Sequence, residues 1–210
     1  MPNVRACGRS LPLVLVHLAL LGTAACSEGP TAGAGRPADE LHFLRPALDA
    51  PPLAATSVSF YAKRGEDREV AIYYRPRPGS SDSSRFLRFR VPASALSRRP
   101  DGTAVAVGDS VLITITVRDP ARFIVEFEPA GLRFSDASPA RLQMEFAEAD
   151  DDVNGDGLVD ARDADATSRL GIWRQEANGQ PWYPTGSTVF ADLQELEANV
   201  LGFTNYAIAY

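Results

Sequence analysis

Apolar side chains recur at every second position along much of the chain after residue 55, and no other feature limits the fold as strongly. The runs with this period lie at residues 58–60, 70–74, 86–91, 111–117, 123–127 and 142–146. A period of two places the apolar side chains of a strand on one face of a sheet. Turn-forming sequences such as Pro100-Asp101-Gly102 separate the runs. We therefore expect an all-β chain, an antiparallel β-sandwich or barrel with at most short helices.

Two segments have the spacing of a short helix rather than of a strand. Residues 161–170 follow an aspartate-rich loop, and residues 192–201 carry leucine and valine at helical intervals. Between these segments, Asn178-Gly179 joins the short runs 172–175 and 181–183. Because Asn-Gly tolerates the positive φ angles of a type I′ turn, we expect a β-hairpin at this position.

Twelve residues, Asp152 to Asp163, carry the most specific chemistry in the sequence. Side-chain oxygens stand at positions one, three, five, nine and twelve of this segment, and Gly157 stands at position six. A Ca²⁺ ion takes about six to eight oxygen ligands, which acidic residues alternating along a tightly curled loop supply. The expected ligands are Asp152, Asn154, Asp156, the backbone carbonyl of Leu158, Asp160 and Asp163. We expect Gly155 and Gly157 to permit the curl and Val159 to pin the loop to the core.

The charge of this region also favours a cation. Residues 148–165 contain eight acidic side chains and one basic side chain, Arg162, which gives a net charge of −7. Carboxylates brought close together repel one another unless a cation lies between them. The alternative is a solvated acidic turn. That alternative explains the acidity but not the placement of oxygens and of Gly157 at specified positions.

Residues 152–160, Asp-Val-Asn-Gly-Asp-Gly-Leu-Val-Asp, resemble the calcium loop of dockerins. Dockerin loops end in Asp, as this one does at Asp163, whereas helix-loop-helix (EF-hand) loops usually end in a bidentate Glu. The resemblance implies calcium binding by the loop. Dockerins carry two loops with helices, while this chain has one loop after the strand-like residues 142–146. A cohesin partner therefore does not follow, and we expect a structural calcium ion.

Several apolar segments resemble a known sandwich family. They are residues 89–96, 127–134 and 139–146, together with the hairpin at 171–182 and the closing residues 202–209. In order and spacing they resemble the ZU-five-type domain of ankyrins and netrin receptors over roughly residues 85–210. The resemblance implies a β-sandwich that mediates interactions and has no shared enzymatic residues. Relative to that family, the calcium loop at 152–163 is an insertion.

Residues 1–25 have the anatomy of an export signal. Arg5 and Arg9 precede the uncharged apolar run 11–25, whose 15 residues are too few for a comfortable membrane span. Small residues at 23–25 lead into Cys26, an arrangement that resembles the lipobox of bacterial lipoproteins. The resemblance implies that Cys26 is lipidated and holds the chain to a membrane of the cell envelope, on its periplasmic or cell-surface side. The alternative is an ordinary secretory signal cleaved after Ala25.

The exported chain divides into two parts. Residues 26–55 are rich in Pro, Gly and Ala and predict a flexible tether. The alternative is docking on the domain through the apolar residues Leu41, Phe43, Leu44 and Leu48. Residues 56–210 have the size of a single domain, which is the expected β-sandwich. Because Cys26 would be the only remaining cysteine, an internal disulfide is excluded, and the core or a metal must stabilise this domain.

Charge and residue usage exclude several classes of function. Without Arg5 and Arg9 the chain has 19 basic and 27 acidic residues, a net charge of −8, so we expect no nucleic-acid partner. Removal of residues 1–25 also leaves His42 as the only histidine. A Ser-His-Asp triad or a zinc centre is therefore not expected, and neither is an enzyme.

These observations predict a lipid-anchored cell-envelope protein with a structural Ca²⁺, acting as an interaction or structural module. Its expected partners are the membrane, through Cys26, and a protein or polysaccharide. The alternative function is a carbohydrate-binding accessory domain. In that alternative Trp173, Trp182 and Tyr183 form a sugar-stacking platform, although aromatic residues on a hairpin also serve as cross-strand pairs and core.

Overall fold

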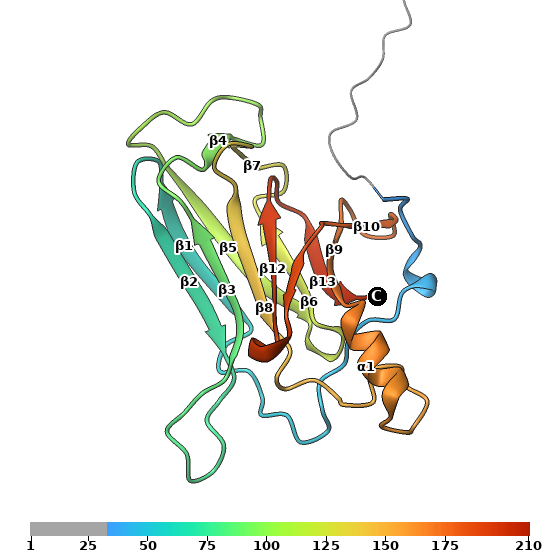
Figure 1. Ribbon diagram of the computed structural model, residues 1–210. Helices are drawn as coiled ribbons and strands as arrows, with labels where there is room; N and C mark the ends of the chain where they lie inside the picture. The colour runs from blue at the N-terminus through green and yellow to red at the C-terminus, as the bar shows by residue number, and fades with distance from the viewer. Residues whose placement is uncertain (1–32) are drawn as a thin grey trace, which may run out of the picture.

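The computed structural model describes residues 33–210, which fold into an antiparallel β-sandwich (Figure 1). One sheet has six strands, in the spatial order β1-β5-β6-β13-β9-β10. In that order they are Ser57–Lys63, Ser110–Asp119, Ile124–Glu128, Asn205–Ala209, Gly171–Gln175 and Trp182–Pro184. The expected export signal at 1–25 and Cys26 lie outside the described residues.

The second sheet has five strands, in the order β11-β12-β8-β3-β2. They are Thr188–Phe190, Glu195–Val200, Ala140–Glu145, Arg85–Val91 and Arg68–Tyr73. A two-stranded ribbon of β4 (Leu96–Arg98) and β7 (Arg133–Phe134) lies beside the two sheets (Figure 1). All strand pairs named here run antiparallel, so the predicted all-β sandwich is confirmed.

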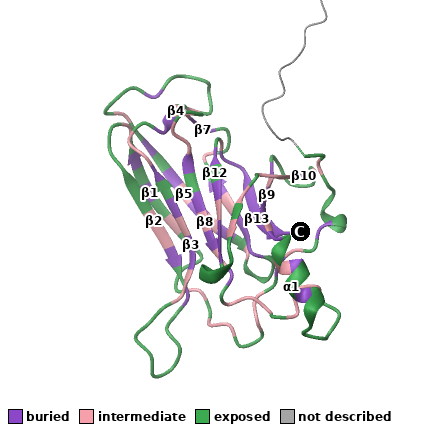
Figure 2. Ribbon diagram, viewed as in Figure 1, coloured by how far each residue is buried: buried purple, intermediate pink, exposed green. Residues whose placement is uncertain are grey.

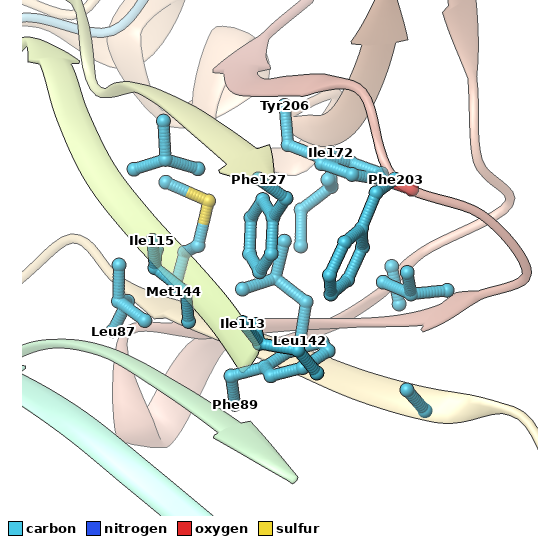
Figure 3. Close-up of a cluster of buried hydrophobic side chains, with 14 of the residues drawn as sticks. Leu87, Phe89, Ile113, Ile115, Phe127, Leu142, Met144, Ile172, Phe203 and Tyr206 are labelled. Atoms are coloured by element: carbon cyan, nitrogen blue, oxygen red, sulfur yellow. The ribbon is translucent and has the colours of Figure 1, made fainter. Parts of the chain in front are cut away.

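Apolar side chains fill the space between the two sheets. Along β5, buried residues alternate with more exposed ones, and Ile113 and Ile115 are fully buried (Figure 2). Figure 3 shows Phe89, Phe127 and Phe203 within this cluster. The rings of Phe89 and Phe127 meet edge to face with their centroids 5.0 Å apart. Such a pair contributes about 0.5–1.5 kcal/mol beyond the burial of the rings. The period-two pattern of the sequence thus describes the inner faces of the sandwich.

The described residues contain one α-helix, and it follows the aspartate-rich loop as expected. α1 spans Ala161–Ser168, and three-residue 3-10 turns lie at Ala38–Glu40, Pro120–Arg122 and Ala191–Leu193. Within residues 33–210, none of the helices has the length and apolar character needed to cross a membrane.

The prediction of a helix at residues 192–201 is wrong. Residues 195–200 form β12, which pairs with β8 from Glu195 opposite Glu145 to Val200 opposite Ala140. Leu196 is fully buried in the core, while Leu193 and Leu201 are exposed. Pairing with β8 buries alternate residues, and this tertiary contact outweighs the helical spacing of the leucines.

The β9–β10 hairpin is confirmed, but its turn differs from the expected one. Gln175 pairs with Trp182, so residues 176–181 form the connection. The backbone N–H of Gln180 donates to Ala177 O at 3.0 Å, and Gly179 has a φ of +80°. A type I′ turn needs positive φ at both central residues. Because Asn178 is not among the residues with positive φ, this is not a type I′ turn.

Residues 33–55, which we call the N-terminal strap, pack against the sandwich instead of forming the expected flexible tether. Backbone bridges join Arg36 to Trp182, Phe43 to Ala209, Pro46 to Ala149 and Leu53 to Tyr74. Leu41 and Leu44 are buried, whereas Leu48 is fully exposed. Burial of apolar side chains offsets the entropy cost of ordering the strap. The docking alternative therefore describes this part of the chain, and the domain begins before residue 56.

Replacement of Leu44 by Ala is expected to destabilise the protein by about 2–5 kcal/mol, because it leaves a cavity in a well-packed core. Leu48→Ala is the matched control, since Leu48 is exposed in the same strap, and should change stability by less than about 0.5 kcal/mol. Urea denaturation of the two variants measures the difference. Equal effects of the two substitutions would contradict docking of the strap.

Candidate metal centre

The aspartate-rich loop connects one sheet to the other. β8 in the five-stranded sheet precedes it, and α1 and then β9 of the six-stranded sheet follow it (Figure 1). The loop must therefore cross an end of the sandwich. Val153 packs on the core at the start of this crossing, whereas Val159 is 71% exposed. The expectation that Val159 pins the loop is wrong, because the residues around the glycines project toward solvent.

Asp152 organises the first half of the loop. Its Oδ1 accepts hydrogen bonds from the backbone N–H groups of Gly155 and Asp156 at 2.8 and 3.0 Å. Its Oδ2 accepts from the N–H of Gly157 at 2.9 Å. Gly155 and Gly157 have φ angles of +77° and +86°, which L side chains rarely adopt. The two glycines therefore permit the curl that the sequence predicts.

Two further oxygens continue this pattern along the loop. Asn154 Oδ1 accepts from the N–H of Asp156 at 2.9 Å, and Asp156 Oδ1 accepts from the N–H of Leu158 at 3.0 Å. Such bonds from a side chain to the backbone two residues later are typical of tight turns. Leu158 is exposed, with its side chain outside the curl.

Asp163 closes the loop. Its Oδ1 accepts from the N–H of Asn154 at 3.1 Å, and its Oδ2 accepts from the N–H of Asp160 at 2.8 Å. Asp160 caps α1 by accepting from the N–H of Arg162, so Asp160 and Asp163 form a reciprocal capping box. Hydrogen bonds from Asp160 and Asn154 hold the pKa of the Asp163 carboxyl below its ordinary value. Position twelve of the loop is thus drawn back against position three.

Arg162 neutralises part of the loop charge. Its guanidinium lies 2.9 Å from Asp156 Oδ2 and 2.8 Å from Asp160 Oδ2. The hydrogen bond from the Arg162 side chain, followed by that from its backbone N–H, lowers the pKa of Asp160. Because the Arg162 side chain is 62% exposed, these ion pairs are weakened by solvent and can exchange for another cation. The sequence pattern gave no sign of this pairing.

The donor atoms match calcium in kind and order, since they are the oxygens that this hard cation prefers. The structure joins Asn154 and Asp163 by a hydrogen bond and places Asp156 and Asp160 around Arg162. Among residues 33–210, no three His, Cys, Asp or Glu side chains are gathered as a metal-holding group. The oxygens instead hold backbone N–H groups and Arg162. Calcium binding therefore requires Arg162 to withdraw and the carboxylates to turn inward.

The N-terminal strap contacts the loop, which the sequence did not predict. The N–H of Asp150 donates to Arg45 O at 2.8 Å, and the N–H of Ala47 donates to Glu148 O at 2.9 Å. Arg45 Nη2 donates to the backbone carbonyl of Asp152 at 3.2 Å and lies 3.9 Å from Asp150 Oδ2. The strap thus brings an additional positive charge to the acidic loop.

The aromatic hairpin does not present a sugar-stacking surface formed by its tryptophans. Trp173 and Trp182 are 8% and 3% exposed, and with Leu41 they belong to a second apolar cluster against which Phe43 packs. Trp173 Nε1 donates to Ala209 O at 2.9 Å. These contacts assign both tryptophans to the packing between strap and sheet.

No family model, curated protein or solved structure that was compared with the chain matches it. The dockerin-like and ZU-five-like resemblances therefore rest on the sequence motifs alone. The relation of this chain to either family stays a prediction.

Replacement of Asp163 by Ala is expected to cost about 1–2 kcal/mol of stability, because it removes half of the capping box and the closure to Asn154. Asp165→Ala is the matched control on the same helix. The Asp165 side chain is 70% exposed and pairs only with Arg169, so its loss should cost less than about 0.5 kcal/mol. Thermal unfolding in calcium-free buffer compares the two, and equal losses would argue against closure by Asp163.

Proposed function

We propose that this chain is a lipid-anchored cell-envelope protein whose β-sandwich acts as an interaction or structural module and is stapled by one Ca²⁺. The observation that carries the calcium assignment is the fold of residues 152–163 into a curl closed by Asp163. The order of the oxygen-bearing residues along this curl is the order that a calcium loop uses, which supports the proposal. Asp152, Asn154, Asp156, the Leu158 carbonyl, Asp160 and Asp163 are the proposed ligands.

A bound Ca²⁺ supplies the positive charge that the loop lacks. Residues 148–165 have a net charge of −7 with Arg162 already counted, and Arg45 of the strap adds only one further positive charge. The strap pairs with residues 148–150, so ordering of the loop also orders its contact with the strap. A structural role follows from this position, because the loop joins both sheets and the strap. Extracellular calcium modules work with Kd values of about 10⁻⁴–10⁻³ M, which is the range expected here.

The proposed anchor sets how far the sandwich extends from a membrane. Gly33 follows Cys26 by seven residues, which span at most about 25 Å in any conformation. The strap is packed from Arg36 onward. Lipidation of Cys26 would therefore hold the sandwich close to the bilayer, where its partner would be an envelope protein or polysaccharide.

Calcium is expected to stabilise the protein against heat. At a calcium concentration of about ten times Kd, binding should stabilise the folded state by about 1.4 kcal/mol. This corresponds to a rise of roughly 3–6 °C in Tm for a chain of this size. EDTA should reverse the rise. The double variant Asp152→Ala, Asp156→Ala should lack the response, because it removes two carboxylate ligands. Differential scanning calorimetry with and without calcium measures the effect.

The Arg162→Gln variant tests the same site in the opposite direction, because it should strengthen calcium binding. It removes the cation that competes for Asp156 and Asp160, so calcium affinity should increase about two- to thirtyfold if the two exposed pairs are worth about 0.2–1 kcal/mol each. An unchanged calcium response in the double aspartate variant would show that the ion binds elsewhere. If calorimetry at millimolar calcium detects no heat of binding, the proposed calcium site is contradicted.

Cys26→Ser is expected to release the protein from the membrane pellet into the soluble fraction, because the substitution removes the thiol that carries the lipid. A single acyl chain gives marginal binding, so the wild-type protein should remain in the pellet only if it carries more than one chain. Cys7→Ser, within the export signal, is the matched control and should not change the distribution. Retention of the Cys26→Ser protein in the pellet would contradict the lipid anchor.

A further inference from the structure

A cleft of about 850 Å³ is lined by residues of β7, β9, β10, β12 and β13, and none of its lining residues belongs to the aspartate loop. Its volume lies within the range of about 300–1,000 Å³ typical of ligand sites. Tyr206, which is fully buried in the core, lines the cleft together with Tyr183 and Gly202. The Tyr206 hydroxyl donates a hydrogen bond to Gly202 O at 2.6 Å. The cleft thus ends against Tyr206, at the border of the core.

An arginine occupies an inward position beside this opening. Arg174 stands opposite Tyr206 in the pairing of β9 with β13, and opposite Tyr183 in the pairing with β10. Directly opposed residues point to the same face of a sheet. Arg174 therefore faces the gap between the sheets, where apolar residues usually lie. Its guanidinium lies 5.8 Å from the centroid of the Tyr183 ring and pairs with Glu176.

A second arginine approaches the cleft from the ribbon. A Cβ at Gly202 would lie 3.0 Å from Arg133 Nη1, so glycine at this position leaves room for the guanidinium. Arg133, Arg174 and Tyr206 all line the cleft. Burial raises the pKa of Tyr206, and the positive charges of Arg174 and Arg133 oppose that rise. Among residues 33–210, no carboxylate forms an ion pair with Arg133. Arg133 is thus a cation available to a ligand.

The remaining polar groups define the chemistry of that ligand. Asp136, Glu176 and Thr185 also line the cleft. Carboxylates accept hydrogen bonds from hydroxyl groups, and guanidinium groups bind carboxylates with two parallel hydrogen bonds. A ligand that carries both carboxylates and hydroxyl groups satisfies both kinds of side chain. A multiply charged phosphate would meet repulsion from Asp136 and Glu176.

An extended peptide fits this part of the sheet less well. Peptides that add to a sheet need free N–H and C=O groups along an edge strand. On β10 the N–H and C=O of Trp182 are both bonded to Arg36 of the strap, at 2.7 and 2.8 Å. Pro184, two residues later, has no N–H to donate. The β10 edge is therefore closed to strand addition.

We propose that this cleft binds an acidic polysaccharide, with Arg133 and Arg174 holding a uronate carboxylate and Asp136 and Glu176 accepting hydrogen bonds from sugar hydroxyl groups. The site is separate from the hairpin tryptophans, which are buried, and from the aspartate loop. The proposal does not depend on calcium binding.

The test is calorimetric binding of a hyaluronan octasaccharide to the full chain in detergent micelles, with calcium held constant. Saturable binding is expected. The same octasaccharide with its carboxylates reduced to alcohols should bind at least tenfold more weakly. Arg133→Gln and Arg174→Gln should each weaken binding of the acidic octasaccharide at least tenfold. Arg141→Gln, which removes an exposed cation on β8 outside the cleft, is the matched control and should change affinity by less than twofold.

Several results would overturn the proposal. They are no binding of the octasaccharide, equal binding of its reduced form, or equal losses in the Arg133→Gln and Arg141→Gln variants. Inorganic phosphate and free glucuronate can each be used to displace the bound octasaccharide. If both displace it at the same concentration, the site binds simple anions rather than a uronate. Tighter binding of an acidic peptide would show a protein partner. Circular dichroism spectra and Tm values matching the wild type establish that the variants are folded.

Discussion

Contact between the inner faces of the two sheets is the interaction on which the rest of the structure depends. Phe89 comes from one sheet and Phe127 from the other, and Phe203 packs against both (Figure 3). β8 belongs to the same sheet as Phe89, and β9 belongs to the same sheet as Phe127. The residues between these strands must therefore cross an end of the sandwich. The aspartate loop owes its exposed position, and its access to the strap, to that crossing.

The strap and the aspartate loop stabilise each other, because each supplies interactions that the other lacks. Proline-rich residues have few backbone donors to contribute to a sheet, and a strongly acidic loop lacks counter-charge. Their pairing at Pro46 and Ala149 places Arg45 beside Asp150 and buries Leu44 in the main core. The described residues 33–210, which contain no cysteine, thereby gain an additional packed segment. The strap begins beside β10, where Arg36 pairs with Trp182, and reaches the proposed metal loop at Pro46.

Two inward-facing positions on β9 differ in burial, and this difference marks the border between the core and the proposed binding cleft. Ile172 and Arg174 both point toward the gap between the sheets from β9, but Ile172 is fully buried and Arg174 is partly exposed. An unpaired guanidinium in the core would cost several kcal/mol, so Arg174 stands where water and Glu176 reach it. In the cleft, polar side chains thus occupy inward-facing positions that apolar side chains fill in the rest of the sandwich.

Local pattern and tertiary contact determined different parts of this protein. Alternation along 111–117 predicts a strand because burial of one face follows from the pleat, and the spacing of Asp152 to Asp163 predicts the curl because its hydrogen bonds are local. Residues 195–200 became a strand only because β8 offers a partner, and the strap became ordered only because the sheet offers an apolar face for Leu41 and Leu44. The ion pairs of Arg162 and the presence of Arg133 and Arg174 in one cleft likewise depend on side-chain positions that the folded chain sets. Sequence patterns record contacts between near neighbours, whereas contacts between distant segments exist only after the two sheets have met.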